Sequence, residues 1–207
     1  MDWIYGGIGR VTNVSEVQGD KHKAILDAAF ALFGSQGFYD AKISDIADLA
    51  GIAKGTVYLY FKSKEKLFSA VSERDFNDFL NRLNTGLEKS ESLKEQLQFI
   101  AKHHLEYYYE RKDHTKLFFM APNNDPELMG LMKNFLRSYM AAVYQILDKA
   151  GVPEPMLHAK AYIGMLDQLK MDILFDRSLT EEDLNKNILF VSRLFMYGCP
   201  VQDGTAS

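Results

Sequence analysis

Residues Ser44 to Glu65 read SDIADLAGIAKGTVYLYFKSKE and decide the fold class of this chain. A first short helix lies in this stretch, with an apolar face made of Ile46, Ala47, Leu49 and Ala50. Gly51 then permits the left-handed backbone that a sharp turn between two helices requires. A second short helix is expected over residues 56–61, with Val57 and Phe61 one turn apart and facing inward. Two short helices joined in this way are typical of a helix-turn-helix, whose second helix reads the DNA major groove.

Polar and basic side chains surround the second helix. They are Lys54, Thr56, Tyr58, Tyr60, Lys62, Lys64 and Lys66. Over residues 51–66 four lysines stand against one glutamate, a local charge of +3 in a chain whose net charge is −4. Because salt screens phosphate attraction beyond about 10 Å, the acidic remainder does not oppose DNA binding by this segment.

The composition of the whole chain is that of a globular protein. Of its 207 residues 47% are hydrophobic and 25% are charged, which is enough to build a substantial core. The single cysteine, Cys199, excludes an intrachain disulfide and fits a reducing compartment. No apolar run approaches the roughly 18 residues of a membrane span, and no signal-peptide pattern opens the chain. We therefore expect a cytoplasmic protein without membrane association.

Apolar residues recur at helical spacing along nearly the whole sequence. The helices expected outside the opening stretch cover residues 21–36, 64–87, 92–112, 115–120, 127–150, 156–176 and 181–197. Gly37 is expected to end the first of them, and Ser63 to cap the second. Thr180 and Asp183 have the spacing of a capping box for the last one. No convincing strand pattern occurs, so the sequence predicts an all-α fold of about nine helices.

A larger set of residues around the turn agrees with one family at fixed spacing. The set comprises Gly37 and Phe38, the runs 43–47 and 50–58, Tyr60, Phe61 and the run 63–65. With these residues the chain resembles the TetR family of bacterial transcriptional regulators over roughly residues 21–70. The resemblance implies a homodimer that binds a palindromic operator and releases it when a small molecule enters the C-terminal domain.

Glycines at positions 6, 7, 9 and 19 and the absence of a clear period predict a flexible N-terminal extension over residues 1–19, in which Arg10 is a candidate for a minor-groove contact. The resemblance implies the organisation of the rest of the chain. Residues 20–66 form a three-helix DNA-binding domain, called the helix-turn-helix domain below. Residues 67–207 form a helical ligand-binding and dimerisation domain, called the effector domain below.

The DNA contacts implied by the resemblance fall on the second helix and its flanks. The candidate residues are Lys42, Lys54, Gly55, Thr56, Tyr58, Tyr60 and Lys64. Free backbone N–H groups at the start of a helix favour phosphate, and Gly55 allows close approach there. Tyrosines offer hydroxyls to phosphates and ring faces to thymine methyls, while Lys64 corresponds to a family phosphate contact.

Two departures from the family pattern change these contacts. The family usually has Thr or Ser at the positions of Ala41 and Lys42, where the hydroxyl caps a helix and touches a phosphate. Here we expect Asp40 or Ser44 to provide the cap and Lys42 to replace the phosphate contact with a charge. Leu59 occupies a position that is often polar or aromatic in the family, so we do not count Leu59 among the DNA contacts.

Aromatic residues and methionines gather in the C-terminal half. The candidates for an effector pocket are Phe99, His103, Tyr107, Phe119, Met132, Phe135, Tyr139, Met165 and Gln168. Asp167, a charge in an otherwise apolar stretch, is a similar candidate. Flexible methionines suit a pocket for a hydrophobic or amphipathic effector. The alternative is ordinary helical core, with satisfied or solvent-facing polar groups.

Other functions have weaker support in the sequence. His103 and His104 are adjacent and point about 100° apart on a helix, so a shared metal is not expected. No nucleophile–base pair or phosphate loop indicates an enzyme, and no cofactor is expected. The remaining alternatives are an enzyme that uses the C-terminal pocket and a protein-interaction module that does not bind DNA.

The last two long helices carry apolar stripes that suit either a core or an interface. The stripes consist of Ile163, Leu166, Leu169 and Ile173, and of Leu184, Ile188, Val191, Leu194 and Phe195. In the resembled family this helix pair forms a four-helix bundle with its mate, so we favour the interface. A symmetric dimer places two reading helices on a palindromic site.

Overall fold

The computed structural model describes residues 14–112, 115 and 125–199, and every regular element among them is a helix. In chain order these are α1 (Val14–Asp40), α2 (Ile43–Leu49), α3 (Lys54–Tyr60), α4 (Lys64–Glu88), α5 (Leu93–Glu110), α7 (Pro126–Lys149), α8 (Pro155–Phe175) and α9 (Glu181–Tyr197). The all-α prediction is confirmed. The helix expected over residues 115–120 lies outside the described residues, apart from Thr115.

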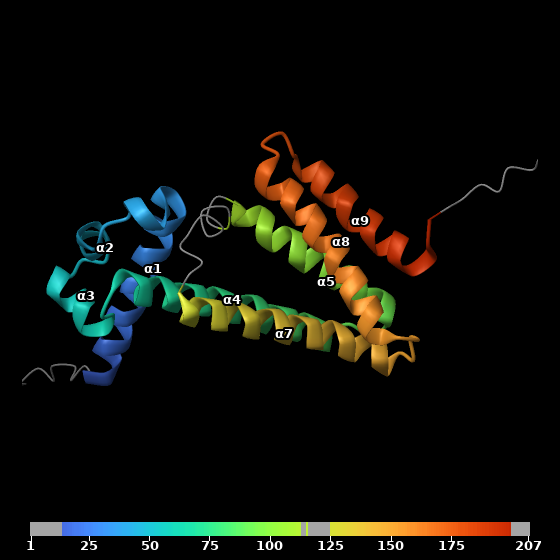
Figure 1. The fold of residues 1–207 in the computed structure, drawn as a ribbon, viewed down its shortest axis with the longest axis horizontal. Helices are drawn as coiled ribbons and strands as arrows, with labels where there is room; N and C mark the ends of the chain where they lie inside the picture. Colours follow the sequence, from blue (N-terminus) through green and yellow to red (C-terminus); the bar gives the residue numbers. More distant parts are fainter. Residues whose placement is uncertain (1–13, 113–114, 116–124, 200–207) are drawn as a thin grey trace, which may run out of the picture.

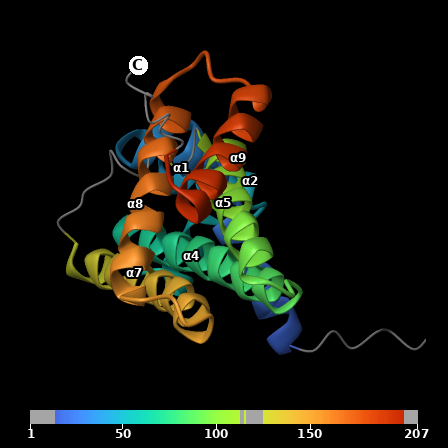
Figure 2. The ribbon, with the colours of Figure 1, turned by 90° about the vertical axis from the view of Figure 1, so that its right-hand side faces the viewer.

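The helices form two groups joined by the long helix α4 (Figure 1). Helices α1, α2 and α3 lie at one end, and α4 leaves them to run side by side with α7. Helices α5, α8 and α9 pack against each other on the other side of the molecule, as the view along its length shows (Figure 2). Because α4 contacts α1, α5 and α7, it joins the helix-turn-helix domain to the effector domain.

The first helix begins earlier than the sequence indicates. It starts at Val14 rather than near Lys21, so part of the expected extension is helical. Gly19 lowers the helix propensity of this turn, but the Tyr60 hydroxyl donates to the Gln18 carbonyl at 3.3 Å. This tertiary contact stabilises a helical turn that the local sequence disfavours. Residues 1–13, with the candidate Arg10, lie outside the described residues.

Several helix ends follow the predicted chemistry. Ser63 accepts a hydrogen bond from the Lys66 N–H at the start of α4, and Thr180 and Asp183 form both bonds of a capping box on α9. Gly37, expected to end the first helix, has a φ of 84° and interrupts it; a short helical turn then continues to Asp40. These local predictions are confirmed because a cap or a glycine break depends on only a few neighbouring residues.

Two hydrophobic clusters hold the described part of the chain together. The first belongs to the helix-turn-helix domain and the start of α4, and includes Ile25, Ala29, Phe33, Phe38, Ile46, Val57, Phe61 and Phe68. The second fills the effector domain and includes Phe79, Leu97, Leu105, Tyr139, Tyr162, Leu166 and Val191. Leu128 of α7 is buried in the first cluster, so a helix of the effector domain packs directly against the helix-turn-helix core.

The predicted interface stripes of the last two helices are largely interior. Most members are less than a tenth exposed, namely Ile163, Leu166, Ile173, Leu184, Ile188 and Val191. Helices α8 and α9 both pack on α5, which covers these residues within the same chain. The prediction that these stripes form a dimer interface is therefore wrong, because α5 of the same chain packs against them.

Candidate functional site

The helix-turn-helix has the expected glycine turn. Gly51 has a φ of 67°, and the backbone N–H groups of Gly51 and Ile52 close the turn onto Asp48 and Ala47. Val57 and Phe61 are buried as predicted. Leu49, expected on the apolar face of α2, is instead 58% exposed, because that short helix packs through Ile43, Ile46 and Ala47.

The start of α2 lacks a side-chain cap. Lys42 occupies the N-cap position and its side chain accepts no hydrogen bond. Neither Asp40 nor Ser44 takes that role, since Asp40 is exposed and Ser44 donates to the carboxylate of Asp45 at 2.9 Å. The predicted replacement cap is wrong. The Lys42 side chain is exposed at this helix end, where its charge suits contact with an anion.

Four of the candidate DNA contacts lie together at the outer surface of α3. Lys54 and Gly55 open the helix and are exposed, Thr56 follows, and Tyr58 is 42% exposed. Leu59, the doubtful position, is 76% exposed and therefore lies on the surface rather than in the core. The placement suits contact with base edges and phosphates, which stays a prediction for each residue.

Tyr60 and Lys64 turn toward α1 instead of outward. Besides the bond from Tyr60 to Gln18, the Lys64 ammonium donates to the carbonyls of Tyr39 and Ala41 at 3.1 and 3.2 Å. It also lies 4.7 Å from the centre of the Phe38 ring. In this geometry both side chains stabilise the packing of α1, so their predicted phosphate contacts require these bonds to be released.

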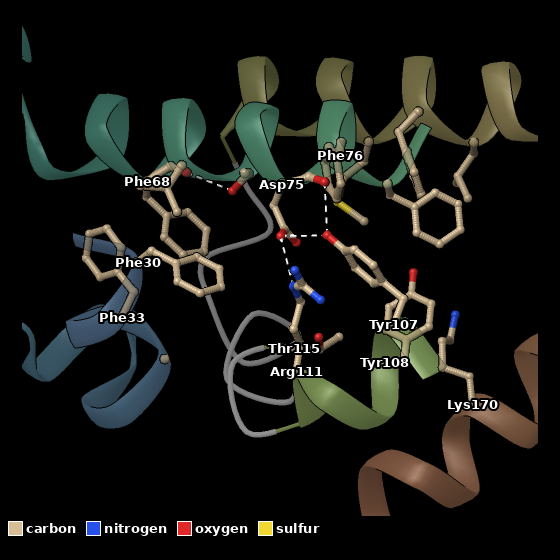
Figure 3. Close-up of a pocket in the computed structure, with 17 residues that line it drawn as sticks. Phe30, Phe33, Phe68, Asp75, Phe76, Tyr107, Tyr108, Arg111, Thr115 and Lys170 are labelled. Carbon is tan, nitrogen blue, oxygen red and sulfur yellow. Dashed lines mark hydrogen bonds and ion pairs between the residues drawn. The ribbon is translucent and has the colours of Figure 1, made fainter. Parts of the chain in front are cut away.

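A mostly apolar cavity of about 240 Å³ lies where the two domains meet (Figure 3). From α1 and α4 it is lined by Phe30, Phe33, Gly34, Phe68, Val71, Ser72, Asp75, Phe76 and Phe79. From the rest of the chain it is lined by Tyr107, Tyr108, Arg111, Thr115, Met132, Phe135, Leu136 and Lys170. The cavity thus has helix-turn-helix residues on one side and effector-domain residues on the other.

A group of three side chains, joined by one hydrogen bond and one ion pair, lies in the middle of this cavity. The Tyr107 hydroxyl donates to the Asp75 carboxylate at 2.6 Å, and the Arg111 Nε lies 3.7 Å from the same carboxylate. The guanidinium also lies 4.2 Å from the centre of the Tyr107 ring. Burial, and then the Asp75 charge, raises the pKa of Tyr107, so its hydroxyl stays protonated and acts as a donor.

Lys170 supplies a second cation at the α8 side. Its ammonium pairs with Asp167 and lies 5.0 Å from the centre of the Tyr108 ring. Burial is the main cause that raises the pKa of Tyr108, with the Asp167 charge adding to it. Asp167, a sequence candidate, therefore acts here as the partner of a cavity-lining lysine.

The structure brings three of the predicted pocket residues to this cavity, namely Tyr107, Met132 and Phe135. Phe119 lies outside the described residues. The other five candidates do not line the cavity; they are Phe99, His103, Tyr139, Met165 and Gln168.

Each of those five has another environment. Phe99 stacks on His103, and its ring lies where a methyl group on Gly86 of α4 would be. His103 Nε2 lies 3.0 Å from the Phe79 carbonyl oxygen, and burial lowers the pKa of this histidine. Tyr139 is buried with its hydroxyl 3.1 Å from His104 Nδ1. Met165 packs against the effector core, and Gln168 is exposed. These five side chains thus lie in the core or at the surface away from this cavity, and their contact with an effector stays a prediction.

Sequence reasoning missed the residues at both ends of the cavity. Phe30, Phe33 and Phe68 have the spacing of core residues, and nothing local distinguishes a ring that borders a cavity from one that fills a core. Lys170 carried a usable signal, since it is a charge within an apolar helical stretch, as Asp167 is. The described residues contain no group of three side chains that could hold a metal, and none of their helices could span a bilayer.

Comparison with known proteins gives the family. A family model described as bacterial regulatory proteins, tetR family, matches residues 25–71. The chain is also 32% identical over 166 residues to an uncharacterised helix-turn-helix transcriptional regulator of Bacillus subtilis, YdgC, covering 75% of this chain and 82% of that protein. The chain belongs to the TetR family. It is a DNA-binding transcriptional regulator.

Other relatives of this TetR-family regulator are similar over shorter or more divergent stretches. A Bacillus subtilis fatty acid metabolism regulator protein is 32% identical over 84 residues, and the match spans 41% of this chain and 43% of that protein. Among solved structures, the Bacillus subtilis regulator FadR in complex with stearoyl-CoA superposes with a TM-score of 0.72. That superposition covers 86% of this chain and 99% of FadR at 22% identity, so it shows a shared fold.

Proposed function

We propose that this TetR-family regulator is a cytoplasmic homodimeric repressor that leaves a palindromic operator when a fatty acyl effector fills its cavity. The single observation that carries the proposal is the apolar cavity between the helix-turn-helix domain and the effector domain. Its aromatic and methionine lining suits a hydrocarbon chain. The likeness to FadR bound to stearoyl-CoA supports this class of effector.

The position of the cavity supports a regulatory rather than an enzymatic use. Its walls include α1 and α4, and α1 packs against α2, which in turn contacts the recognition helix α3. A ligand that binds one arrangement of these helices better than another shifts the population toward it. Its binding free energy then alters the separation of the two recognition helices in a dimer, and with it the fit to DNA.

We place the dimer interface on the outer face of α8 and α9. Four large apolar side chains there are more than half exposed, namely Leu157, Phe175, Leu189 and Phe190. An exposed apolar patch on helices whose inner faces are already buried suits an interface between two copies. The proposed DNA contacts are those of Lys42, Lys54, Gly55, Thr56 and Tyr58, with Tyr60 and Lys64 available only after release from α1.

The test uses the purified chain and DNA fragments from around its own gene. Gel shifts identify a bound palindrome, and stearoyl-CoA is then titrated into the complex, with coenzyme A as the matched control. We expect stearoyl-CoA to release the DNA and coenzyme A to leave it bound. Calorimetry on the free protein checks that stearoyl-CoA binds with a negative heat-capacity change, the signature of apolar burial. Failure of stearoyl-CoA both to bind and to release DNA would refute the effector assignment.

A further inference from the structure

The two ends of the cavity differ in chemistry. Figure 3 shows Phe30, Phe33 and Phe68 at one end and Lys170 at the other, with Asp75, Arg111 and Tyr107 between them. The first end is formed by α1 of the helix-turn-helix domain and the start of α4, and the second by α8. An effector with one polar and one apolar end therefore has a preferred direction in this cavity.

The aromatic end is a suitable site for the terminus of a hydrocarbon chain. Phe33 and Phe68 are each 5% exposed and meet edge to face with ring centres 5.2 Å apart, while Phe30 is half-buried beside them. The Ser72 hydroxyl, which also lines the cavity, donates to the Phe68 carbonyl at 2.7 Å. Because that hydroxyl is already bonded within α4, this end favours an apolar group.

The lysine end is a suitable site for an oxygen acceptor. The Lys170 side chain is 13% exposed, whereas that of its partner Asp167 is 42% exposed. Asp167 can therefore return to water at small cost if an effector oxygen takes its place. Arg111, by contrast, lies within 4 Å of Asp75, Asp78 and Glu110, so its charge is already balanced by three carboxylates.

We propose that a fatty acyl effector lies along the cavity with its oxygen-bearing head at Lys170 and its methyl end against Phe30 and Phe33, so that α1 of the helix-turn-helix domain selects chain length. This orientation rests on the proposed function and adds to it the direction of binding and the residues that set selectivity. The shared chemistry of the head is an acceptor oxygen, from the carboxylate of a free fatty acid or from an acyl thioester.

The contacts of Phe33 explain how the length of a bound acyl chain can change the position of the DNA-binding helices. The Phe33 ring stacks on Phe38, with ring centres 5.9 Å apart, and Phe38 lies near the end of α1, one short connection before α2 begins at Ile43. Each further methylene buried in the cavity tightens binding about fourfold. A chain that extends beyond the rings must displace α1, whose packing sets the position of α2 and α3.

The experiment compares two matched variants across a series of saturated acyl-CoA thioesters, from octanoyl through stearoyl to docosanoyl, by calorimetry on the full chain. Phe30→Ala opens the aromatic end, and Phe99→Ala removes another half-buried ring, one that does not line the cavity. We expect Phe30→Ala to move the optimum to longer chains, with about a fourfold gain for each added methylene that becomes buried. Phe99→Ala should keep the wild-type optimum. Phe30→Leu is a milder variant that retains apolar packing and should give a smaller shift in the same direction.

A further variant tests the position of the effector head. Lys170→Met should weaken all chain lengths by a similar factor, about tenfold or more, and leave the optimum unchanged. The series is repeated with free fatty acids: a larger loss for the acids than for the thioesters identifies a carboxylate at Lys170, and a larger loss for the thioesters identifies the thioester head.

Three outcomes would refute the orientation while leaving the proposed function intact. In the first, Phe30→Ala and the wild type bind the same acyl chain length most tightly. In the second, Phe30→Ala and Phe99→Ala shift the preferred chain length equally. In the third, Lys170→Met binds every chain length as tightly as the wild type does. Absence of acyl binding by the wild type would instead refute the proposed function, and the orientation with it.

Discussion

The helix-turn-helix domain and the effector domain use their polar side chains in opposite ways. In the first, Lys42, Lys54 and Tyr58 are exposed around an apolar core. In the second, His104 and Tyr139 are buried against each other, and the buried Tyr162 donates to the Leu97 carbonyl at 2.5 Å. One domain presents polar groups to an external polyanion, while the other holds them in its interior close to a cavity.

The two domains nevertheless share contacts that link them. Leu128 of α7 is buried in the helix-turn-helix core, and the neighbouring Glu127 pairs with Lys66 at the start of α4. On the other side, Arg74 of α4 pairs with Asp27 of α1 at 2.6 Å. The comparison therefore teaches that the domains differ in chemistry but are mechanically joined through α4 and α7, next to the cavity.

The largest effect is expected from breaking the joint at Leu128. Leu128→Ala leaves a cavity in the helix-turn-helix core and should lower the free energy of unfolding by about 2–5 kcal/mol. Leu136→Ala is the matched control, because Leu136 lies on the same helix but is 53% exposed, and it should cost below about 1 kcal/mol. Urea denaturation of both variants measures the difference. Equal losses would mean that α7 does not depend on the helix-turn-helix core.

Acid should destabilise the effector domain through its buried histidine. Burial, followed by the charge of Lys170, holds the pKa of His104 well below 6.5. The unfolded chain therefore binds a proton that the folded chain excludes, and stability falls as the pH drops below about 6.5, by about 1 kcal/mol per pH unit. Denaturant titrations between neutral and mildly acidic pH measure this slope. His104→Gln should flatten it, and an unchanged slope would exclude His104 as its source.

A pair of glycine substitutions in the helix-turn-helix domain should change stability in opposite directions. Gly51→Ala places a methyl group on left-handed backbone and should cost about 1–2 kcal/mol, since no neighbouring atom lies within 4 Å of the new methyl and the strain is in the backbone. Gly55→Ala, in helical backbone with equally open surroundings, should stabilise the fold by about 0.5–1 kcal/mol. Thermal denaturation checks the signs. Gel shifts should also show weaker operator binding for Gly55→Ala if DNA approaches that backbone.

The smallest expected effect is a difference between two lysines of the helix-turn-helix domain in how their removal changes the salt dependence of DNA binding. Lys54→Ala removes an exposed charge and should lower DNA affinity. The slope of the logarithm of the binding constant against the logarithm of the salt concentration should fall by about one. Lys64→Ala removes the two bonds to the carbonyls of Tyr39 and Ala41, so it should lower stability by about 1 kcal/mol and change the salt dependence less. Fluorescence-anisotropy titrations at several salt concentrations give both slopes. The reverse ranking of the slopes would show that Lys64 leaves α1 and contacts phosphate in the complex.

Local features of this protein were determined by its sequence alone. The turn at Gly51, the inward Val57 and the caps at Ser63 and Thr180 depend on residues within one or two turns of one another. A helical period, a cap and a turn glycine are encoded in neighbouring residues, so they can be predicted without knowing what packs against them.

The tertiary structure alone decided which face of each helix meets which neighbour. The cavity joins Phe30 of α1 to Lys170 of α8, and Lys64 points back to the end of α1. Leu166 and Val191 are covered within the same chain, whereas Leu189 and Phe190 are exposed. A helical period shows that a face is apolar but not what covers it, because the covering residues come from distant parts of the chain and are selected by the packing of the whole molecule.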